Sequence, residues 1–334
     1  MLISIIIPAY NLEKHISQCL ISIKNQTINS RRFEVIIIND NSQDRTLRII
    51  TKYKDKFNNF SIINNKNNIG PGLSRNKGIS IAKGKYIMFL DGDDTLSKNS
   101  LRVIDKYLKK KNYDFVGYNF NKILSKRKIL KNYRKDFKFI KKNINIRIKN
   151  FLNGEIDGSV IFTIIKKDLI RKNKIHFYSG LHEDIFFIFK IYYYSRNFTL
   201  INKSLYFKKN RKDSIVNTLD EKRIKDLFKQ SLLIKNFLIK KKIKFKKINK
   251  FFIRGLVGSM GAILMENLSL KNLAKRAKIY RLIYKLMNKT LINEQRPNKS
   301  KKDKIVNLFL NILKSKNNNI GIFKIYEKKA IKLI

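Results

Sequence analysis

The sequence predicts an α/β fold in which a mostly parallel sheet is flanked by helices and is followed by a mainly helical C-terminal region. Over the first 110 residues, short apolar runs alternate with segments whose apolar residues recur at helical spacing. Each apolar run ends in polar residues, and from residue 220 onward only helical spacing recurs. Such alternation of strands and helices is typical of a parallel sheet with helices on both faces.

Four apolar runs near the N-terminus are expected to be strands, at 3–8, 33–38, 60–63 and 86–90. Unbroken runs of this kind favour parallel strands that are buried on both faces. Helices are expected between and after these strands, at 12–26, from about 43 to 57, at 71–84 and at 97–110. Pro71 suits the start of the third helix and Gly84 suits its end.

Beyond residue 110 the pattern becomes mixed. Further strands are expected at 114–120, 159–165 and 198–207, with a helix at 181–194. The very basic stretch 122–149 is interpreted as an exposed excursion. Later helices are expected at 220–240, 248–267, 270–288 and 302–315. We therefore expect an α/β domain over 1–217, with halves at 1–105 and 106–217, and a basic helical region over 218–334.

Positive charge is concentrated in the second half of the chain. The protein has 75 Lys and Arg against 24 Asp and Glu, a formal net charge of +51. Residues 1–105 carry 16 basic and 9 acidic side chains, which leaves +44 for residues 106–334. Such a field would attract phosphates, anionic lipid headgroups or nucleic acid. A genome rich in A and T, which favours Lys, Asn and Ile codons, explains the same composition equally well.

Cysteine content and hydropathy indicate the compartment. A single cysteine, Cys19, excludes an internal disulfide framework and suits a reducing environment. No basic segment precedes the first apolar run, and no stretch of about 18 uncharged apolar residues is present. We expect no signal peptide and no spanning helix, and hence a cytoplasmic protein whose contact with the inner face of the membrane is peripheral.

The loop after the fourth predicted strand is the clearest candidate site. Asp91, Asp93 and Asp94 lie within four residues of one another around Gly92. Three adjacent carboxylates repel one another unless a cation lies among them, and a hard divalent cation carrying a phosphorylated ligand fits this requirement. The alternative is a solvated acidic turn that caps the next helix. In parallel sheets, ligands bind beyond the C-terminal ends of the strands, so loops 9–11, 39–44 and 91–94 should converge.

The order of five motifs is more specific than any one of them. The motifs are IIIPAYN (5–11), IIINDNSQD (36–44), SRNKG (74–78), FLDGDD (89–94) and HED (182–184). In this order they strongly resemble the family 2 glycosyltransferases, which are inverting enzymes of the GT-A fold that use nucleotide-activated sugars. The resemblance is close over 3–105 and looser to about 217. It does not extend to the C-terminal helices.

The resemblance implies a donor site at the first three motifs. Pro8, Ala9 and Tyr10 would form a wall against the nucleotide, and Asp40 would accept a hydrogen bond from the uracil N3–H. Arg75 would contact the base or the phosphates, because a guanidinium supplies several fixed donors. The alternatives are a turn that ends the strand for residues 8–10, a helix cap for Asp40, and an exposed helical arginine for Arg75.

The resemblance also implies a metal site in the acidic turn. Asp91 would lie near the ribose, and Asp93 would bind Mn²⁺ or Mg²⁺, which bridges the two phosphates and acts as Lewis acid for the departing nucleoside diphosphate. Asp94 is assigned a supporting or sugar-binding role.

An inverting transfer needs a base on the acceptor side, and the resemblance implies that Asp184 is this base. Glu183 and His182 would shape the acceptor pocket, although two acids also suit a helix N-terminus and His182 also suits a structural role. Tyr206 and residues 210–215 resemble a segment that follows the catalytic helix and lies near the diphosphate in many relatives, and Arg211 and Ser214 are the candidates there.

These features predict a metal-dependent glycosyltransferase with a nucleotide-sugar donor, most simply a UDP-sugar, and a hexosyl or N-acetylhexosaminyl group to transfer. The predicted acceptor is a cell-surface glycan precursor: a lipooligosaccharide, a capsule or a lipid-linked oligosaccharide. The alternative is a basic protein that binds nucleic acid or membrane without transferase activity. We expect no nucleic-acid partner, because the chain has no recognisable nucleic-acid motif and no Trp, and its ordered motifs lie in its least basic third.

Overall fold

The computed structural model describes residues 1–125, 128–132, 140, 143–152, 155–209, 221–243 and 282. Apart from residue 282, the helices expected at 248–267, 270–288 and 302–315 lie outside these residues. The chain divides into two compact units. The first comprises Met1–Lys141 and Gly158–Ser214, and the second comprises Lys142–Asp157 and Ile215–Ile334. The domain boundary at residue 217 stays a prediction.

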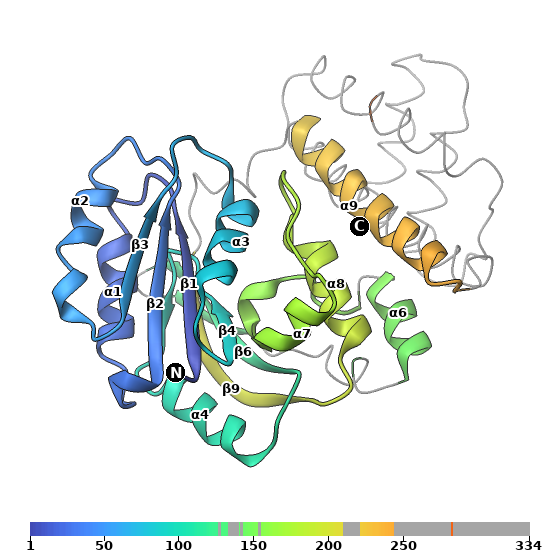
Figure 1. The fold of residues 1–334 in the computed structure, drawn as a ribbon, viewed down its shortest axis with the longest axis horizontal. Coiled ribbons are helices and arrows are strands. Elements are labelled where there is room, and N and C mark those ends of the chain that lie inside the picture. Colours follow the sequence, from blue (N-terminus) through green and yellow to red (C-terminus); the bar gives the residue numbers. More distant parts are fainter. Residues whose placement is uncertain are drawn as a thin grey trace. The chain divides into compact units, whose positions relative to one another are not determined.

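A mixed sheet forms the centre of the first unit (Figure 1). In the part of the chain that the structure describes it has nine strands, in the order β3-β2-β1-β4-β8-β6-β9-β5, with β7 paired to β6. The strands are β1 Ile3–Ala9, β2 Phe33–Asn39, β3 Phe60–Asn64, β4 Tyr86–Phe89, β5 Thr95–Leu96, β6 Phe115–Ser125, β7 Lys128–Asn132, β8 Thr163–Lys166 and β9 Phe198–Lys209. Strands β1 to β4 pair in parallel, as do β6 and β9, whereas β8 runs antiparallel to β4 and β6. The predicted mostly parallel α/β sheet is confirmed.

Helices cover both faces of the parallel strands. In Figure 1, α1 and α2 lie on one side of strands β1 to β3 and α3 lies on the other. Strand β2 is buried along its whole length, and so is the apolar run of β1, which explains the absence of hydrophobic–polar alternation in both. The helices of this unit are α1 Ile16–Lys24, α2 Thr46–Thr51, α3 Pro71–Ile81, α4 Ser100–Lys110, α7 Lys167–Lys172 and α8 Asp184–Tyr194.

The first helix begins at Ile16, four residues later than predicted. The residues before it form a turn whose backbone hydrogen-bonds to the loop after β2. Leu12 N donates to Thr46 Oγ1 across 2.6 Å, and Glu13 N donates to Asp44 Oδ2 across 3.0 Å. In a helix that began at residue 12, the N–H groups of residues 12 and 13 would have no partner within the helix. Here they have partners at the end of the loop after β2, so the loops after β1 and β2 are connected.

The basic stretch 122–149 was predicted as an exposed excursion, and among its described residues this prediction is wrong where Ile140, Arg147 and Ile148 are buried. It contains the end of β6, strand β7 and the start of α6 (Ile144–Leu152). In α6, the Arg147 and Ile148 residues are only 7% and 2% exposed. Apolar residues recur among the lysines at a spacing that still forms one buried helix face. The strand predicted at 159–165 is also shorter, because a 3₁₀ turn at Val160–Phe162 precedes β8.

In the second unit the structure describes helices α6 and α9, and α9 (Glu221–Lys240) agrees with the helix predicted at 220–240. Four of the residues that α9 buries are Ile224, Leu227, Ile234 and Leu238, which lie on one helical face. Among the described residues, no helix is long and apolar enough to cross a membrane.

Candidate active site

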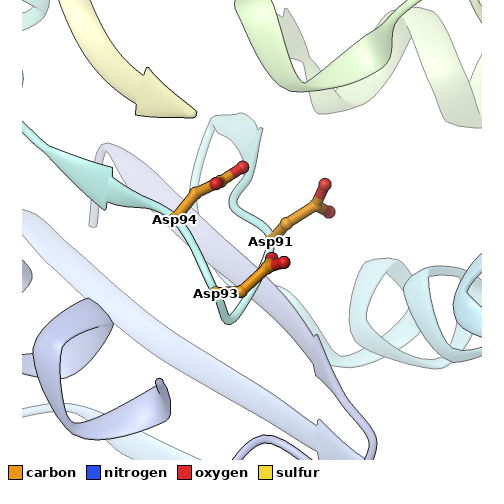
Figure 2. Close-up of side chains that lie close together, drawn as sticks. All are labelled: Asp91, Asp93 and Asp94. Carbon is orange, nitrogen blue, oxygen red and sulfur yellow. The ribbon is translucent and has the colours of Figure 1, made fainter. Parts of the chain in front are cut away.

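The acidic turn follows β4 and leads directly into β5. Leu90 N donates to Ile6 O across 3.1 Å, and Asp94 N donates to Asp91 O across 3.0 Å, so that residues 91–94 close a tight turn. Figure 2 shows the three carboxylates on the same side of this turn. One carboxylate oxygen from each of Asp91, Asp93 and Asp94 lies within 4.8 Å of those of the other two. The structure therefore brings together the three carboxylates that the sequence singles out.

The three carboxylates differ in burial. Asp91 and Asp93 are partly exposed, whereas Asp94 is only 2% exposed. The Asp94 oxygens accept hydrogen bonds from Tyr206 Oη at 2.7 Å and from Lys209 N at 2.7 Å. Burial, together with the negative charges of Asp91 and Asp93, raises the pKa of Asp94 to about 8. Asp94 therefore lies within the protein, with both oxygens bound to strand β9.

The chemistry of the turn fits a hard divalent cation. Carboxylate oxygens are the ligands that Mg²⁺ and Mn²⁺ prefer, and a cation would relieve the repulsion that raises the pKa of Asp94. Asp94 is buried with both oxygens bonded to β9, whereas Asp91 and Asp93 are partly exposed, so Asp91 and Asp93 are better placed to bind an ion from solvent. This agrees with the prediction of a metal ligand at Asp93, which stays a prediction.

Arg75 connects the acidic turn to the start of α8. Its Nη2 donates to Asp91 Oδ1 across 2.8 Å, and its Nη1 donates to Glu183 Oε1. The Arg75 side chain is only 6% exposed, and its guanidinium lies 5.6 Å from the centre of the Phe177 ring. Burial opposes the charge, but the carboxylates of Asp91, Glu183 and Asp184 raise the pKa of Arg75 above its usual value. The alternative of an exposed helical arginine is therefore wrong, and the contact of Arg75 with the base or the phosphates stays a prediction.

Gly72 allows the approach of Glu183 to helix α3. A Cβ atom at position 72 would lie 2.5 Å from Glu183 Cγ and 3.0 Å from Tyr178 O. Real contacts of this kind do not occur, so any other residue would displace Glu183 or the backbone beside it. Because position 72 has no side chain, Glu183 can approach α3 and contact Arg75, which lies one helical turn after Gly72.

The motif at 182–184 lies at the start of α8. Asp184 is the first residue of the helix, Glu183 is its N-cap, and His182 has a positive φ of 59°. Glu183 is 7% exposed and is bound to Arg75, while Asp184 is close enough to raise the pKa of Arg75. The two acids therefore differ in environment. Asp184 stays the predicted base, and His182 stays a predicted acceptor residue.

The loop after β1 lies beside the loop after β2. Asn11 N donates to Ser42 Oγ, and Gln43 N donates to Asn11 Oδ1 across 2.8 Å. Tyr10 is 44% exposed at this edge, whereas Ala9 is buried and Pro8 is half-buried. A tyrosine ring that is open to solvent at a strand end is available for stacking against a base. The nucleotide wall at residues 8–10 stays a prediction, for which the exposed side chain of this segment is Tyr10.

Asp40 lies between β2 and the start of α3. It is 3% exposed, and its Oδ1 accepts from Asn65 Nδ2 at 2.7 Å and from Ile69 N at 3.0 Å. Its Oδ2 accepts from Gly70 N at 2.8 Å. Asp40 therefore fixes the loop before α3. The hydrogen bond from uracil N3–H to Asp40 stays a prediction. This bond would use a remaining lone pair on Oδ2.

Arg211 and Ser214, the other two candidates, lie outside the described residues. Asn65 and Gly72 have no predicted role at the site, and Tyr206 is predicted only as part of a segment near the diphosphate, without a contact to the acidic turn. Asn65 is one of many asparagines in its loop, so the sequence does not distinguish it from its neighbours. Gly72 follows a helix-starting proline, which is a weak signal of close packing. The partner of Tyr206 is 112 residues away in sequence, and no local pattern indicates it.

Comparison with known proteins identifies the family. The sequence profile of Glycosyl transferase family 2 matches residues 4–173, which include the acidic turn and the first three motifs. The chain belongs to this family. The predicted resemblance to this family is thus confirmed, and the match covers just over half of the chain.

Two relatives show how far the sequence likeness extends. A poly(ribitol-phosphate) beta-glucosyltransferase of Bacillus spizizenii is 34% identical over 183 residues, which cover 53% of this chain and 27% of the relative. A cholesterol galactosyltransferase of Borreliella burgdorferi is 30% identical over 230 residues, covering 65% of this chain and 62% of the relative. This family 2 chain thus matches less than two thirds of the length of either relative.

Solved structures agree with the fold. Residues 1–349 of Staphylococcus aureus TarS, in complex with UDP-GlcNAc, superpose with a TM-score of 0.73 and 20% identity. The superposition covers 99% of this chain and 92% of that chain. The predicted GT-A fold of this family 2 chain is therefore confirmed.

Proposed function

We propose that this family 2 enzyme moves a hexosyl or N-acetylhexosaminyl group from a UDP-sugar to a hydroxyl group of a cell-surface glycan precursor, with inversion and with the help of a divalent metal. The observation that carries the proposal is the bridge from Asp91 through Arg75 to Glu183. One guanidinium joins the carboxylates of the donor side to the motif that supplies the acceptor-side base. The proposed donor site, at Asp91, and the proposed acceptor site, at Glu183, thus lie at the two ends of one ion pair network.

The donor half consists of the acidic turn and the loops after β1 and β2. Asp91 and Asp93 would hold Mn²⁺ or Mg²⁺, which when bound neutralises the charge of the leaving nucleoside diphosphate. Tyr10 would stack on the base of the nucleotide. Asp40 would orient the loop before α3, which would face this base. The complex of TarS with UDP-GlcNAc supports a UDP-sugar as the donor.

The acceptor half begins at α8. A hydroxyl group that attacks the anomeric carbon opposite the leaving phosphate must lose a proton, and a single displacement of this kind inverts the configuration. Consecutive helical residues point about 100° apart, so Glu183 and Asp184 face different directions. Because Glu183 is bound to buried Arg75, Asp184 is the acid we assign to the acceptor proton.

The relatives support a surface glycan as the acceptor. According to their names, the Bacillus spizizenii relative acts on poly(ribitol-phosphate) and the Borreliella burgdorferi relative acts on cholesterol. We propose a lipooligosaccharide, a capsule precursor or a lipid-linked oligosaccharide for this chain, reached from the cytoplasmic side. Its excess of basic residues after position 105 would then favour peripheral contact with anionic lipid.

A donor screen tests this function. Thermal unfolding of the full chain would be measured with UDP-, GDP- and CDP-sugars, each with Mn²⁺ and with EDTA. We expect one UDP-sugar to raise the midpoint only when Mn²⁺ is present, and transfer assays with that donor to give a product of inverted anomeric configuration. Stabilisation by a GDP- or CDP-sugar alone would contradict the UDP donor, and full transfer activity in EDTA would contradict the role of the metal.

A further inference from the structure

Tyr206 contacts the acidic turn from strand β9. Its hydroxyl group donates to Asp94 Oδ2 across 2.7 Å and accepts from the backbone N–H of Asp91 across 3.3 Å. The Tyr206 side chain is fully buried. At this point β9 pairs with β5, where Leu96 lies opposite Tyr206. A single hydroxyl group therefore joins the first and last residues of the turn 91–94 to the sheet.

A second bond from β9 completes the attachment of Asp94. Lys209 N donates to Asp94 Oδ1 across 2.7 Å, so each carboxylate oxygen of Asp94 accepts from β9. In Figure 2 the arrowhead of a yellow strand, the colour of β9 in Figure 1, ends close to Asp94. A buried carboxylate bonded through both oxygens has one orientation, and Asp94 N in turn donates to Asp91 O. The shape of the turn thus depends on β9.

We propose that Tyr206 is a positioning residue for the metal-binding carboxylates. It fixes the acidic turn so that Asp91 and Asp93 present their oxygens together to a divalent cation, while Asp94 serves as the attachment point of the turn. The proposal rests on the metal-assisted transfer proposed above. Metal affinity depends on such supporting hydrogen bonds, because a cation needs its ligands in a narrow geometry before it binds.

The ring of Tyr206 has a separate role from its hydroxyl group. The ring packs edge-on against Phe162, with 5.4 Å between ring centres. The Tyr206→Phe substitution keeps this ring and removes only the oxygen that contacts Asp91 and Asp94. A loss of metal affinity in this variant therefore reports on the hydrogen bonds and not on core packing.

Tyr118 supplies a matched control. It is also fully buried, and its hydroxyl group donates to Ile161 O across 2.7 Å. It lies on β6, the strand that pairs with β9, but its bond is to a backbone carbonyl group and not to the acidic turn. The Tyr118→Phe substitution removes a buried hydroxyl group of the same kind, so the two variants should lose similar thermal stability.

The experiment titrates Mn²⁺ into the full chain in the presence of UDP, by calorimetry, for the wild type and both variants. We expect Tyr206→Phe to weaken Mn²⁺ binding by about tenfold or more and Tyr118→Phe to stay within about twofold of the wild type. The same titration of Asp94→Ala and of the double variant Asp94→Ala with Tyr206→Phe should show losses that are less than additive, because the two residues contact each other.

The other outcomes separate a failure of the positioning role from a failure of the metal-assisted function. Wild-type affinity in Tyr206→Phe, equal losses in the two Phe variants, or fully additive losses with Asp94→Ala would each overturn the positioning role and leave metal-assisted transfer intact. A wild-type chain that binds no Mn²⁺ with UDP present would overturn the metal-assisted function, and the role of Tyr206 with it.

Discussion

Arg75 donates through Nη2 to Asp91 Oδ1 across 2.8 Å, beneath the acidic turn and almost out of contact with solvent. The same guanidinium donates through Nη1 to Glu183. Helix α3 thereby connects two motifs that are 92 residues apart in sequence, the one at Asp91 and the one at Glu183. The stability of this protein and the activity proposed for it should therefore both depend on Arg75.

Loss of Arg75 should destabilise the protein as well as inactivate it. In Arg75→Leu the Glu183 carboxylate, which is 7% exposed, would stay buried without its cation. Removing one partner of a buried ion pair costs about 3 kcal/mol or more of unfolding free energy, which urea denaturation measures. The control is Arg171→Leu, because Arg171 is 78% exposed in its pair with Asp168 and should cost at most about 1 kcal/mol. An equal loss of unfolding free energy in the two variants would show that the buried ion pairs of Arg75 stabilise the protein no more than an exposed pair does.

Asp93→Ala should abolish metal-dependent donor binding. Asp93 is partly exposed in a turn where Asp94 is bound to β9, so its carboxylate is the one we assign first to the cation. We expect Mn²⁺ to stabilise the wild type against heat in the presence of UDP, and to leave the midpoint of Asp93→Ala unchanged. Asp168→Ala, a substitution at an exposed carboxylate on α7, should keep the full Mn²⁺ response. Undiminished Mn²⁺ stabilisation of Asp93→Ala would remove Asp93 from the site.

Asp184→Asn should separate binding from transfer. The amide keeps the shape of the side chain but cannot accept the proton of the acceptor hydroxyl group, so kcat should fall by about 10² to 10⁴. The affinity for the UDP-sugar, measured by calorimetry, should stay close to that of the wild type. Near-normal turnover would assign the base to another residue, and lost donor affinity would place Asp184 on the donor side.

Lys190 provides a prediction for the pH dependence of stability. It lies on α8 with its Nζ 4.8 Å from the centre of the Phe186 ring, and burial lowers the pKa of Lys190 to about 8. An unfolded lysine titrates near pH 10.4, so between about pH 8 and pH 10.4 the unfolded chain binds more protons than the folded one. The penalty for burying the charged amine is complete below pH 8 and fades as the pH rises through this window.

Lys190→Met should therefore raise the unfolding free energy at pH 7, and the gain should shrink towards pH 10. Urea denaturation at both pH values measures the difference. Lys106→Met, at an exposed position of α4, should change stability equally at both values. A gain from Lys190→Met that does not vary with pH would mean that the amine stays fully charged in the folded state.

Membrane contact can be tested through the basic charge. If the +44 of residues 106–334 serves to bind the inner face of the membrane, the full chain should pellet with vesicles of anionic phospholipid and not with neutral vesicles. The binding should weaken with added salt, because surface charges are screened. Equal recovery with both kinds of vesicle would favour genome composition as the origin of the charge.

Much of the fold follows from local patterns. The unbroken apolar runs of β1 and β2 determine strands buried on both faces, because no polar face remains for solvent. The alternation with helices then determines the parallel sheet, and the parallel sheet places the loops after β1, β2 and β4 at one edge. The residues at the site were predictable because local sequence decides where a strand ends.

The roles within the site were decided by tertiary structure. The resemblance names Asp91, Asp93, Asp94 and Arg75 as candidates, but local sequence indicates neither their burial nor their hydrogen-bond partners. Their differences come from long-range contacts, since Asp94 is buried by a tyrosine 112 residues later and Arg75 is enclosed by an acid 108 residues later. Burial and hydrogen-bond partners set the charge and orientation of an ionisable group, and only the folded chain brings those partners together.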